Sequence, residues 1–245
     1  MGLYVYAIGG EDDQNPLPVQ GVFDEPVIRL EEGALGVFVS ECADTSVRPE
    51  RRHIAATQRV LTSLSARFDI LPMAFGTVAQ SREDLRSFVS DHRDLLTTQL
   101  NRISGAVEMS LRLHLDVADP IAYVVQRSPI LQQARERTFG GRRPPSHDSK
   151  LRLGRMFDEA LRQYRDVQTS QLITQLGGVC TELQSLPVRQ EREIVNVAAL
   201  VPRTGIAQFE AAVHALATQI VDEIAINIGG PWAPHNFVQF SLDDA

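Results

Sequence analysis

The chain has 245 residues, of which 43% are hydrophobic, and it carries a formal net charge of −7 at pH 7. This length suits one large domain or two small ones, and the acidic balance lacks the global positive field that drives nucleic-acid binding. No apolar run approaches the roughly 20 residues that a membrane-spanning helix needs, and the first residues resemble no signal peptide. We therefore expect a cytoplasmic protein with neither nucleic acid nor a membrane among its partners.

Motifs of catalysis and metal binding are missing from the sequence. Cys42 and Cys180 form no CxxC pair, and the six histidines show neither HxxxH nor HExxH spacing. No phosphate-binding loop, dinucleotide-binding glycine motif or GxSxG nucleophile elbow occurs. Ser146, His147 and Asp148 have the residue types of a catalytic triad, but consecutive residues on a loop cannot converge as a triad must. We expect no catalytic residues, no cofactor and no metal.

Strands and one helix are predicted in the first 68 residues. Residues 3–8 form an apolar run that ends at two glycines, and residues 27–30 and 35–40 are predicted to form a hairpin. From Pro49 the apolar period becomes that of a helix. The residues assigned to its apolar face are Ile54, Leu61, Leu64 and Phe68.

A second helix follows an apolar link at residues 69–78. Ser81 and Asp84 have the spacing of a capping box, and Gly105 is suited to the C-terminal end. The apolar stripe of this helix consists of Leu85, Phe88, Val89, His92, Leu95, Leu96 and Ile103.

Residues 107–116 have the most regular strand pattern in the chain. One face would carry Val107, Met109, Leu111, Leu113 and Leu115, and the other Glu108, Ser110, Arg112 and His114. Because successive side chains of a strand point to opposite faces, we expect one face to be buried and the other to be wet or to cover a polar site.

The region after this strand is predicted to be helical. Asp119 and Pro120 are typical of an N-cap and a first helical turn, and Pro129 should kink or end the helix that they begin. A long helix is predicted over about 149–184. Residues of about 121–184 would therefore form a helical hairpin.

The last part of the chain alternates between strand and helix. Residues 194–201 and 224–228 read as strands, with an amphipathic helix between them that carries Ile206, Phe209, Val213, Leu216 and Ile220. With the strand at 107–116 and the long helix, they fit a ferredoxin-like arrangement. We predict an α+β protein of two domains: residues 1–104, a mixed α+β domain, and residues 105–245, a modified ferredoxin-like domain with the inserted hairpin and the C-terminal tail.

The chain ends in an unusually apolar tail that contains Trp232, the only tryptophan. Termini are more often polar and frayed. A buried Trp or Phe removes on the order of 150–250 Å² from water, so Trp232 and Phe237 are expected to seal the sheet of the second domain. The alternative is that the tail docks on a partner.

A basic cluster lies between residues 135 and 155. It consists of Arg135, Arg137, Arg142, Arg143, Lys150, Arg152 and Arg155. The favoured interpretation is a solvated loop with flanking helix charge, and the alternative is a site for an anionic partner.

Six segments, in order along nearly the whole chain, resemble the gas vesicle protein GvpF/GvpL family. They are Leu-Tyr-Val-Tyr-Ala-Ile at 3–8, Leu-Pro-Met-Ala-Phe-Gly-Thr-Val at 71–78, Gly-Ala-Val-Glu at 105–108, Ala-Tyr-Val at 122–124, Ala-Leu-Val-Pro at 199–202, and Gly-Pro-Trp-Ala-Pro-His-Asn-Phe at 230–237. The chain departs from the family pattern at Met109, where an aromatic is common, and at Ala233 and His235, where Pro and Tyr are common.

The resemblance implies two α+β domains, a role in building gas vesicles and no known catalysis. The implied partners are the hydrophobic shell subunit and other vesicle accessory proteins, and the implied location is the gas vesicle in the cytoplasm. The residues marked as an interaction or structural motif are Leu71, Pro72, Phe75, Gly76, Glu108, Gly230, Pro231, Trp232, Pro234 and Phe237. The alternative function is binding or conversion of a small ligand by the polar face of strand 107–116.

Overall fold

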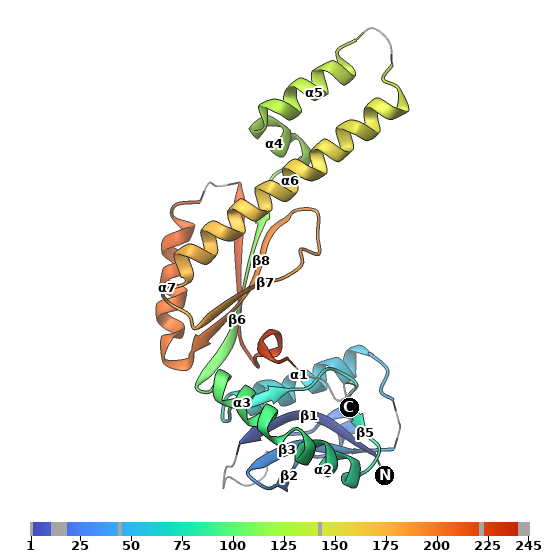
Figure 1. The fold of residues 1–245 in the computed structure, drawn as a ribbon, viewed down its shortest axis with the longest axis vertical. Helices are drawn as coiled ribbons and strands as arrows, with labels where there is room; N and C mark the ends of the chain where they lie inside the picture. The colour runs from blue at the N-terminus through green and yellow to red at the C-terminus, as the bar shows by residue number, and fades with distance from the viewer. Residues whose placement is uncertain (1, 11–18, 44–45, 142–143, 221–222, 240–245) are drawn as a thin grey trace. The chain divides into compact units, whose positions relative to one another are not determined.

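The computed structural model describes residues 2–10, 19–43, 46–141, 144–220 and 223–239 (Figure 1). The chain divides into two compact units. The first unit comprises residues 1–109, 200–204 and 230–245, and the second comprises residues 110–199 and 205–229. Both the first and the last segment of the chain therefore belong to the first unit.

The first unit is built on an antiparallel sheet with the strand order β2-β3-β1-β4, in which β5 also pairs with β1. The elements of this region are β1 (Gly2–Gly10), a 3-10 turn η1 (Val22–Asp24), β2 (Ile28–Glu32), β3 (Leu35–Cys42), α1 (Arg51–Ser65), β4 (Ile70–Pro72), β5 (Val78–Ala79), α2 (Arg82–Asp91) and α3 (Arg93–Ile103).

The predicted strands of this unit are confirmed. β1 is buried from Leu3 to Gly9, which explains its continuous apolar sequence. β2 and β3 form the expected hairpin, with Leu30 opposite Val37. The turn between them contains Gly33 at φ +72°, a conformation that glycine adopts at little cost.

Helix α1 packs its apolar face into the core of the first unit, but this face is not quite the predicted one. Leu61, Leu64 and Phe68 are buried, whereas Ile54 is 47% exposed. His53 and Thr57 occupy the buried side one turn earlier. The helix thus turns two polar residues inward, where each has a hydrogen bond to a main-chain carbonyl.

The helix predicted over the next segment is two helices. Ser81 caps α2 by accepting the N–H of Asp84, as the capping box predicts. At His92 the backbone leaves helical geometry, with φ −107° and ψ 14°, and α3 begins one residue later. Because of this break, Leu95 is 40% exposed, although it belongs to the predicted apolar stripe.

The second sheet has the strand order β7-β8-β6-β9. From residue 106 onward the elements are β6 (Ala106–Leu115), α4 (Pro120–Arg127), α5 (Pro129–Phe139), α6 (His147–Leu176), β7 (Glu182–Ser185), β8 (Glu193–Pro202), a 3-10 turn η2 (Arg203–Gly205), α7 (Ile206–Ala217), β9 (Ile224–Trp232) and a 3-10 turn η3 (His235–Phe237).

This element order and strand order match the β-α-β-β-α-β pattern of ferredoxin-like folds, with α4 and α5 inserted before α6. The alternating burial predicted for 107–115 holds from Ser110 to Leu115, where Leu111 and Leu115 are buried and Arg112 is exposed, but Glu108, on the predicted polar face, is buried. Two boundaries differ from the prediction. α6 ends at Leu176 and is followed by the short strand β7, which the sequence analysis had included in the helix, and β9 extends to Trp232.

The helical hairpin forms within the second unit, as expected. Asp119 caps α4, and Pro129 both ends α4 and begins α5. Figure 1 shows α4 and α5 beside the first half of α6, and α7 beside its second half. Within the described ranges, none of the helices is long and apolar enough to cross a membrane.

Candidate functional site

The C-terminal segment, residues 230–239, has both buried and exposed side chains, and the buried ones anchor it. Phe237 is fully buried, and Ala233 and Pro234 are buried as well. Pro231 is exposed, and Trp232 retains 37% of its accessible surface. The segment is therefore fixed to the protein and still presents its indole to solvent.

This segment packs on the first unit, whereas the sequence analysis had placed it on the second domain. Ala233 belongs to the core cluster that also contains Tyr4, Tyr6 and Leu61. Ala233 is separated from these three core residues by most of the chain. No local sequence pattern shows that the last strand brings the chain back to the first unit.

Glu108, a predicted motif residue at the start of β6, holds the C-terminal segment. Its Oε2 accepts the backbone N–H of Asn236 at 2.8 Å, and its Oε1 accepts the side-chain Nδ2–H at 2.6 Å. The residue is 6% exposed. Burial raises the pKa of this carboxyl, and the two hydrogen bonds from Asn236 oppose that rise. Asn236 was not among the predicted site residues.

Gly230 passes so close to β6 that no other residue fits. Its φ is +124°, and a Cβ placed on it would lie 2.8 Å from Met109 Sδ and 2.9 Å from the carbonyl oxygen of Glu108. The peptide bond from Gly230 to Pro231 is cis. Gly230 and Pro231 both belong to the last part of β9.

The predicted motif at 71–78 also lies in the first unit. Leu71 pairs with Ile8 and Pro72 with Ala7, and the N–H of Met73 donates to the carbonyl of Tyr6 at 2.9 Å. These contacts add β4 to the edge of β1. The side chain of Leu71 is fully buried, so its role is in packing.

The remainder of that motif surrounds the side chain of Tyr4. The N–H of Gly76 donates to the Tyr4 hydroxyl at 3.1 Å, and Gly76 needs its positive φ of +89° to do so. Phe75 places its ring edge-on to Tyr4, with 6.2 Å between centroids. The hydroxyl also contacts Thr57 Oγ1 at 3.0 Å. Burial raises the pKa of Tyr4, and the hydrogen bonds with Thr57 and Gly76 oppose that rise.

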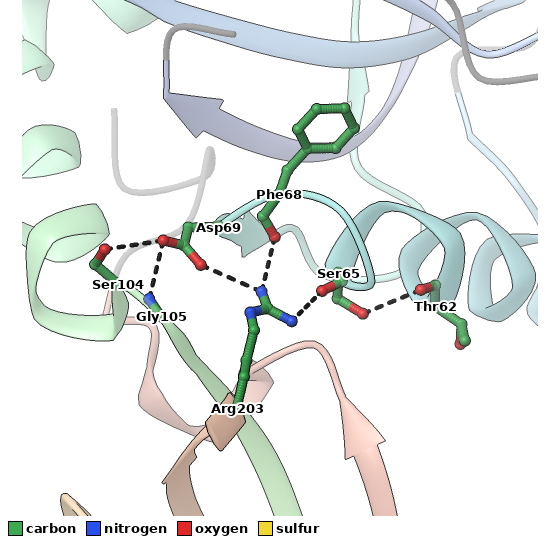
Figure 2. A network of polar contacts seen from close by, with 7 residues as sticks. All are labelled: Thr62, Ser65, Phe68, Asp69, Ser104, Gly105 and Arg203. Carbon is green, nitrogen blue, oxygen red and sulfur yellow. Dashed lines mark hydrogen bonds and ion pairs between the residues drawn. The ribbon is translucent and has the colours of Figure 1, made fainter. Parts of the chain in front are cut away.

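A polar network that the sequence analysis missed lies nearby in the first unit. Figure 2 shows Arg203 reaching the end of α1, where its guanidinium donates to the carbonyl oxygens of Ser65 and of Phe68, the latter at 3.0 Å. It also pairs with Asp69 Oδ1 at 3.2 Å. The planar guanidinium can serve several acceptors at once.

Asp69 extends this network to the start of β6. Its Oδ2 accepts the Ser104 hydroxyl and the N–H of Gly105, each at 2.9 Å (Figure 2). The N–H of Arg203 in turn donates to the carbonyl of Gly105 at 2.9 Å. An arginine directly after the strand-ending Pro202 was visible in the sequence, but nothing in the sequence identified its partners.

Two charged residues on the polar face of β6, which the alternative hypothesis uses, have partners within the protein. Both carboxylate oxygens of Glu108 are taken by Asn236. Arg112 is exposed and pairs with Glu193 Oε1 at 3.8 Å, while Glu193 Oε2 accepts the N–H of Arg189. Glu108 is therefore buried and bonded, and Arg112 is engaged in a separate ion pair, while His114, the third charged or polar residue of this hypothesis, is half-buried.

A metal site would need several His, Cys, Asp or Glu side chains close together in the part of the chain that the structure describes. There, no group of three or more His, Cys, Asp or Glu side chains could hold a metal ion. Cys42 is buried and Cys180 is partly buried. The predicted motif residues thus divide into core packing at 71–76, anchoring by Glu108, Gly230, Pro234 and Phe237, and an exposed pair, Pro231 and Trp232.

Several known proteins are similar to this chain over its whole length. Gas vesicle protein F of Streptomyces sp. (strain CB03234) is 28% identical over 245 residues, which cover 98% of this chain and 100% of the relative. Gas vesicle protein F of Microcystis aeruginosa (strain PCC 7806) is 24% identical, with 98% of each chain covered.

Solved structures share the fold. The crystal structure of GvpF from Microcystis aeruginosa superposes with a TM-score of 0.80 at 23% identity, covering 98% of this chain and 99% of that one. The crystal structure of GvpF from Anabaena sp. PCC7120 gives 0.79 at 20% identity, covering 98% and 97%. The model of a family described as gas vesicle synthesis protein GvpL/GvpF matches residues 2–239, and the chain belongs to this family.

Proposed function

We propose that this protein is an accessory or minor structural protein of the gas vesicle, required for vesicle assembly, and that it acts by binding the hydrophobic shell subunit. Its membership of the GvpL/GvpF family over residues 2–239 supports the vesicle association. The relatives named above carry the name gas vesicle protein F. The site of action in this proposal is the gas vesicle in the cytoplasm, with other vesicle accessory proteins as further partners.

The physical need for such a protein follows from the shell. A gas-filled shell must present an apolar inner wall, so its main subunit exposes apolar surface until it assembles. Exposed apolar surface and unpaired strand edges drive aggregation. A partner that covers this surface would keep the subunit available for assembly, and the role is one of binding rather than catalysis.

The observation that carries the proposal is the way in which Trp232 is presented. Its neighbours Ala233, Pro234 and Phe237 are buried, and Glu108 holds the backbone of Asn236. The indole, at 37% exposure, therefore stands on a fixed base. Tryptophan is over-represented among the residues that dominate binding energy, and an anchor that is already ordered loses little entropy on binding.

The experiment is co-expression of the shell subunit with the full chain, followed by measurement of soluble shell subunit and by pull-down. We expect the wild-type chain to raise the soluble fraction and Trp232→Ala to lose most of that gain. Ile54→Ala is the matched control, because Ile54 is an exposed apolar side chain of the same unit at 47%. If the wild-type chain neither binds the shell subunit nor changes its solubility, the proposal is wrong.

A further inference from the structure

An open apolar groove runs between the three helices of the hairpin. Its volume is about 420 Å³, and the residues that line it come from α4, α5 and α6. The apolar ones include Ile121, Val125, Leu131, Phe139, Leu153 and Phe157. This volume falls in the range of roughly 300–1,000 Å³ that is typical of binding pockets. We call this feature the hairpin groove.

The rim of the hairpin groove exposes large apolar side chains. Among the lining residues, Ile121 is 50% exposed and Phe139 is 53% exposed. Single exposed apolar residues are ordinary, but several around one apolar depression usually mark a contact surface. The groove is open, so an occupant can lie along it instead of being enclosed.

Positive charge surrounds this apolar surface. Between residues 135 and 155 the sequence has seven cations and two anions, a net charge of +5 in a chain whose net charge is −7. Five of these cations fall in the described residues and are exposed: Arg135, Arg137, Lys150, Arg152 and Arg155. In the described part of the structure none of the five forms an ion pair, although other arginines of α6 do have partners. Two of the five, Arg135 and Lys150, line the groove itself, and their charges can complement acidic groups of a partner.

The charges of the residues that line the groove favour a protein partner over a polyanion of uniform charge. Arg135 and Lys150 line the groove, and so do Asp119 and Asp158. Because α5 and α6 run antiparallel in the hairpin, Arg135 and Lys150 lie toward its tip, whereas Asp119 begins α4 and Asp158 lies two turns further along α6. A nucleic-acid backbone or an anionic lipid surface would meet both signs of charge. A helix of a partner protein, in contrast, can carry acidic residues only at the end that faces Arg135 and Lys150.

From this geometry we propose that the hairpin groove binds an amphipathic α-helix of a partner protein, with apolar side chains in the groove and acidic side chains against the cations at the hairpin tip. In helix-in-groove binding, the groove contacts apolar residues of the bound helix at positions i, i+3 or i+4, and i+7. The groove belongs to the second unit and Trp232 belongs to the first, and the proposal stands or falls independently of the function proposed above.

The test uses the full chain and a synthetic helical peptide that contains no lysine, with leucine at i, i+3, i+4 and i+7 and glutamate on the flanks. Two comparison peptides replace either every glutamate by glutamine or every leucine by serine. We expect the first peptide to bind at least about tenfold more tightly than either comparison at low salt, with the difference from the glutamine peptide shrinking as salt rises.

Lys150 permits a direct map of the contact, because it is the only lysine of the chain. A carbodiimide joins an amine to a carboxylate with loss of water, so the only candidate amines are Lys150 and the N-terminus. We expect the glutamate peptide to cross-link to Lys150 in preference to the N-terminus.

Variants of exposed residues separate binding from folding. Ile121→Gln with Phe139→Gln should weaken binding of the glutamate peptide by at least about tenfold, and Arg135→Glu with Lys150→Glu should do the same. The matched controls are Ile54→Gln for the apolar pair and Arg51→Glu with Arg59→Glu for the charge pair, all on α1 and all exposed. Circular dichroism checks that each variant is folded.

Three results would overturn the proposal. One is equal binding of the three peptides. Another is loss of binding in the α1 controls but not in the groove variants. The third is that vesicles of anionic lipid, or single-stranded RNA, bind more tightly than the glutamate peptide and lose that binding in the same groove variants, which would make the surface a polyanion site.

Discussion

The guanidinium of Arg203 pairs with the carboxylate of Asp69 at 3.2 Å across 134 residues of sequence. The same guanidinium caps the carbonyls that follow α1, and the same carboxylate binds the start of β6 through Gly105. Segments from the beginning, middle and end of the chain are thus tied together in the first unit by one charged pair.

Removal of this arginine should destabilise the first unit. We expect Arg203→Ala to lower its free energy of unfolding by about 2 kcal/mol, because a partly buried carboxylate and two carbonyls lose a charged donor. Arg203→Lys should recover part of the loss, since an ammonium lacks the planar fork. The measurement is urea unfolding followed by the fluorescence of Trp232, which lies in the first unit. Arg59→Ala, at an exposed position of α1, is the control, and equal losses in the two variants would contradict the role given to Arg203.

The two aromatic residues of the C-terminal segment should behave in opposite ways. Phe237 is fully buried, so Phe237→Ala should cost about 3–5 kcal/mol of stability. Trp232 keeps 37% of its surface in water, and Trp232→Ala should cost clearly less. Urea unfolding followed by circular dichroism compares them. A larger loss for Trp232 would mean that the indole packs into the core instead of standing ready for a partner.

Gly230 should tolerate no side chain. At φ +124°, alanine is strained, and its Cβ would collide with Met109 Sδ and the Glu108 carbonyl. We expect Gly230→Ala to destabilise the first unit by more than about 1 kcal/mol. Gly10→Ala is the matched control, because a Cβ there meets nothing within 4 Å. Thermal unfolding of both variants is the measurement, and an unchanged transition for Gly230→Ala would contradict the close approach.

Glu108 should make stability depend on pH. Burial raises the pKa of this carboxyl above its ordinary value of 4.5, so the folded chain binds this proton more tightly than the unfolded chain. Its contribution to stability is therefore greatest below pH 4.5 and falls as the pH rises through the folded pKa. The measurement is the difference in unfolding free energy between wild type and Glu108→Gln, taken at several pH values.

That difference should become less favourable to wild type as the pH rises, because glutamine does not ionise. Glutamine also offers an N–H₂ group to one of the two Asn236 donors, which adds a loss that does not vary with pH. Glu41→Gln, at an exposed position of β3, controls for the loss of one formal charge. A difference that stays constant or grows with pH would contradict the effect of burial on Glu108.

Local patterns in the sequence predicted most elements because those elements have a clear period or a clear cap. The alternation from Ser110 to Leu115, the Ser81 cap and the role of Pro129 are confirmed. β4, β5 and β7 have two to four residues each, too few for any period to show. The family resemblance covered the last two residues of β4 and the first residue of β5, in the motif at 71–78, but no residue of β7.

Long-range pairing was beyond sequence reasoning. The partners of Glu108 and Arg203 are 128 and 134 residues away, and no pattern links such positions in a single sequence. For the same reason the C-terminal segment was placed on the wrong domain, although its packing by Phe237 was expected. Ile54 has the spacing of a core residue, but the helix turns His53 inward instead because a main-chain carbonyl is there to bond it.

The most direct test of the central claim, that this chain is required for vesicle assembly, is deletion of its gene in the host cell with complementation. Light scattering by intact cells measures gas-filled vesicles. We predict that the deletion abolishes the vesicle signal, that the wild-type gene and the Ile54→Ala variant restore it, and that Trp232→Ala does not. Normal vesicle scattering in the deletion strain would contradict the claim.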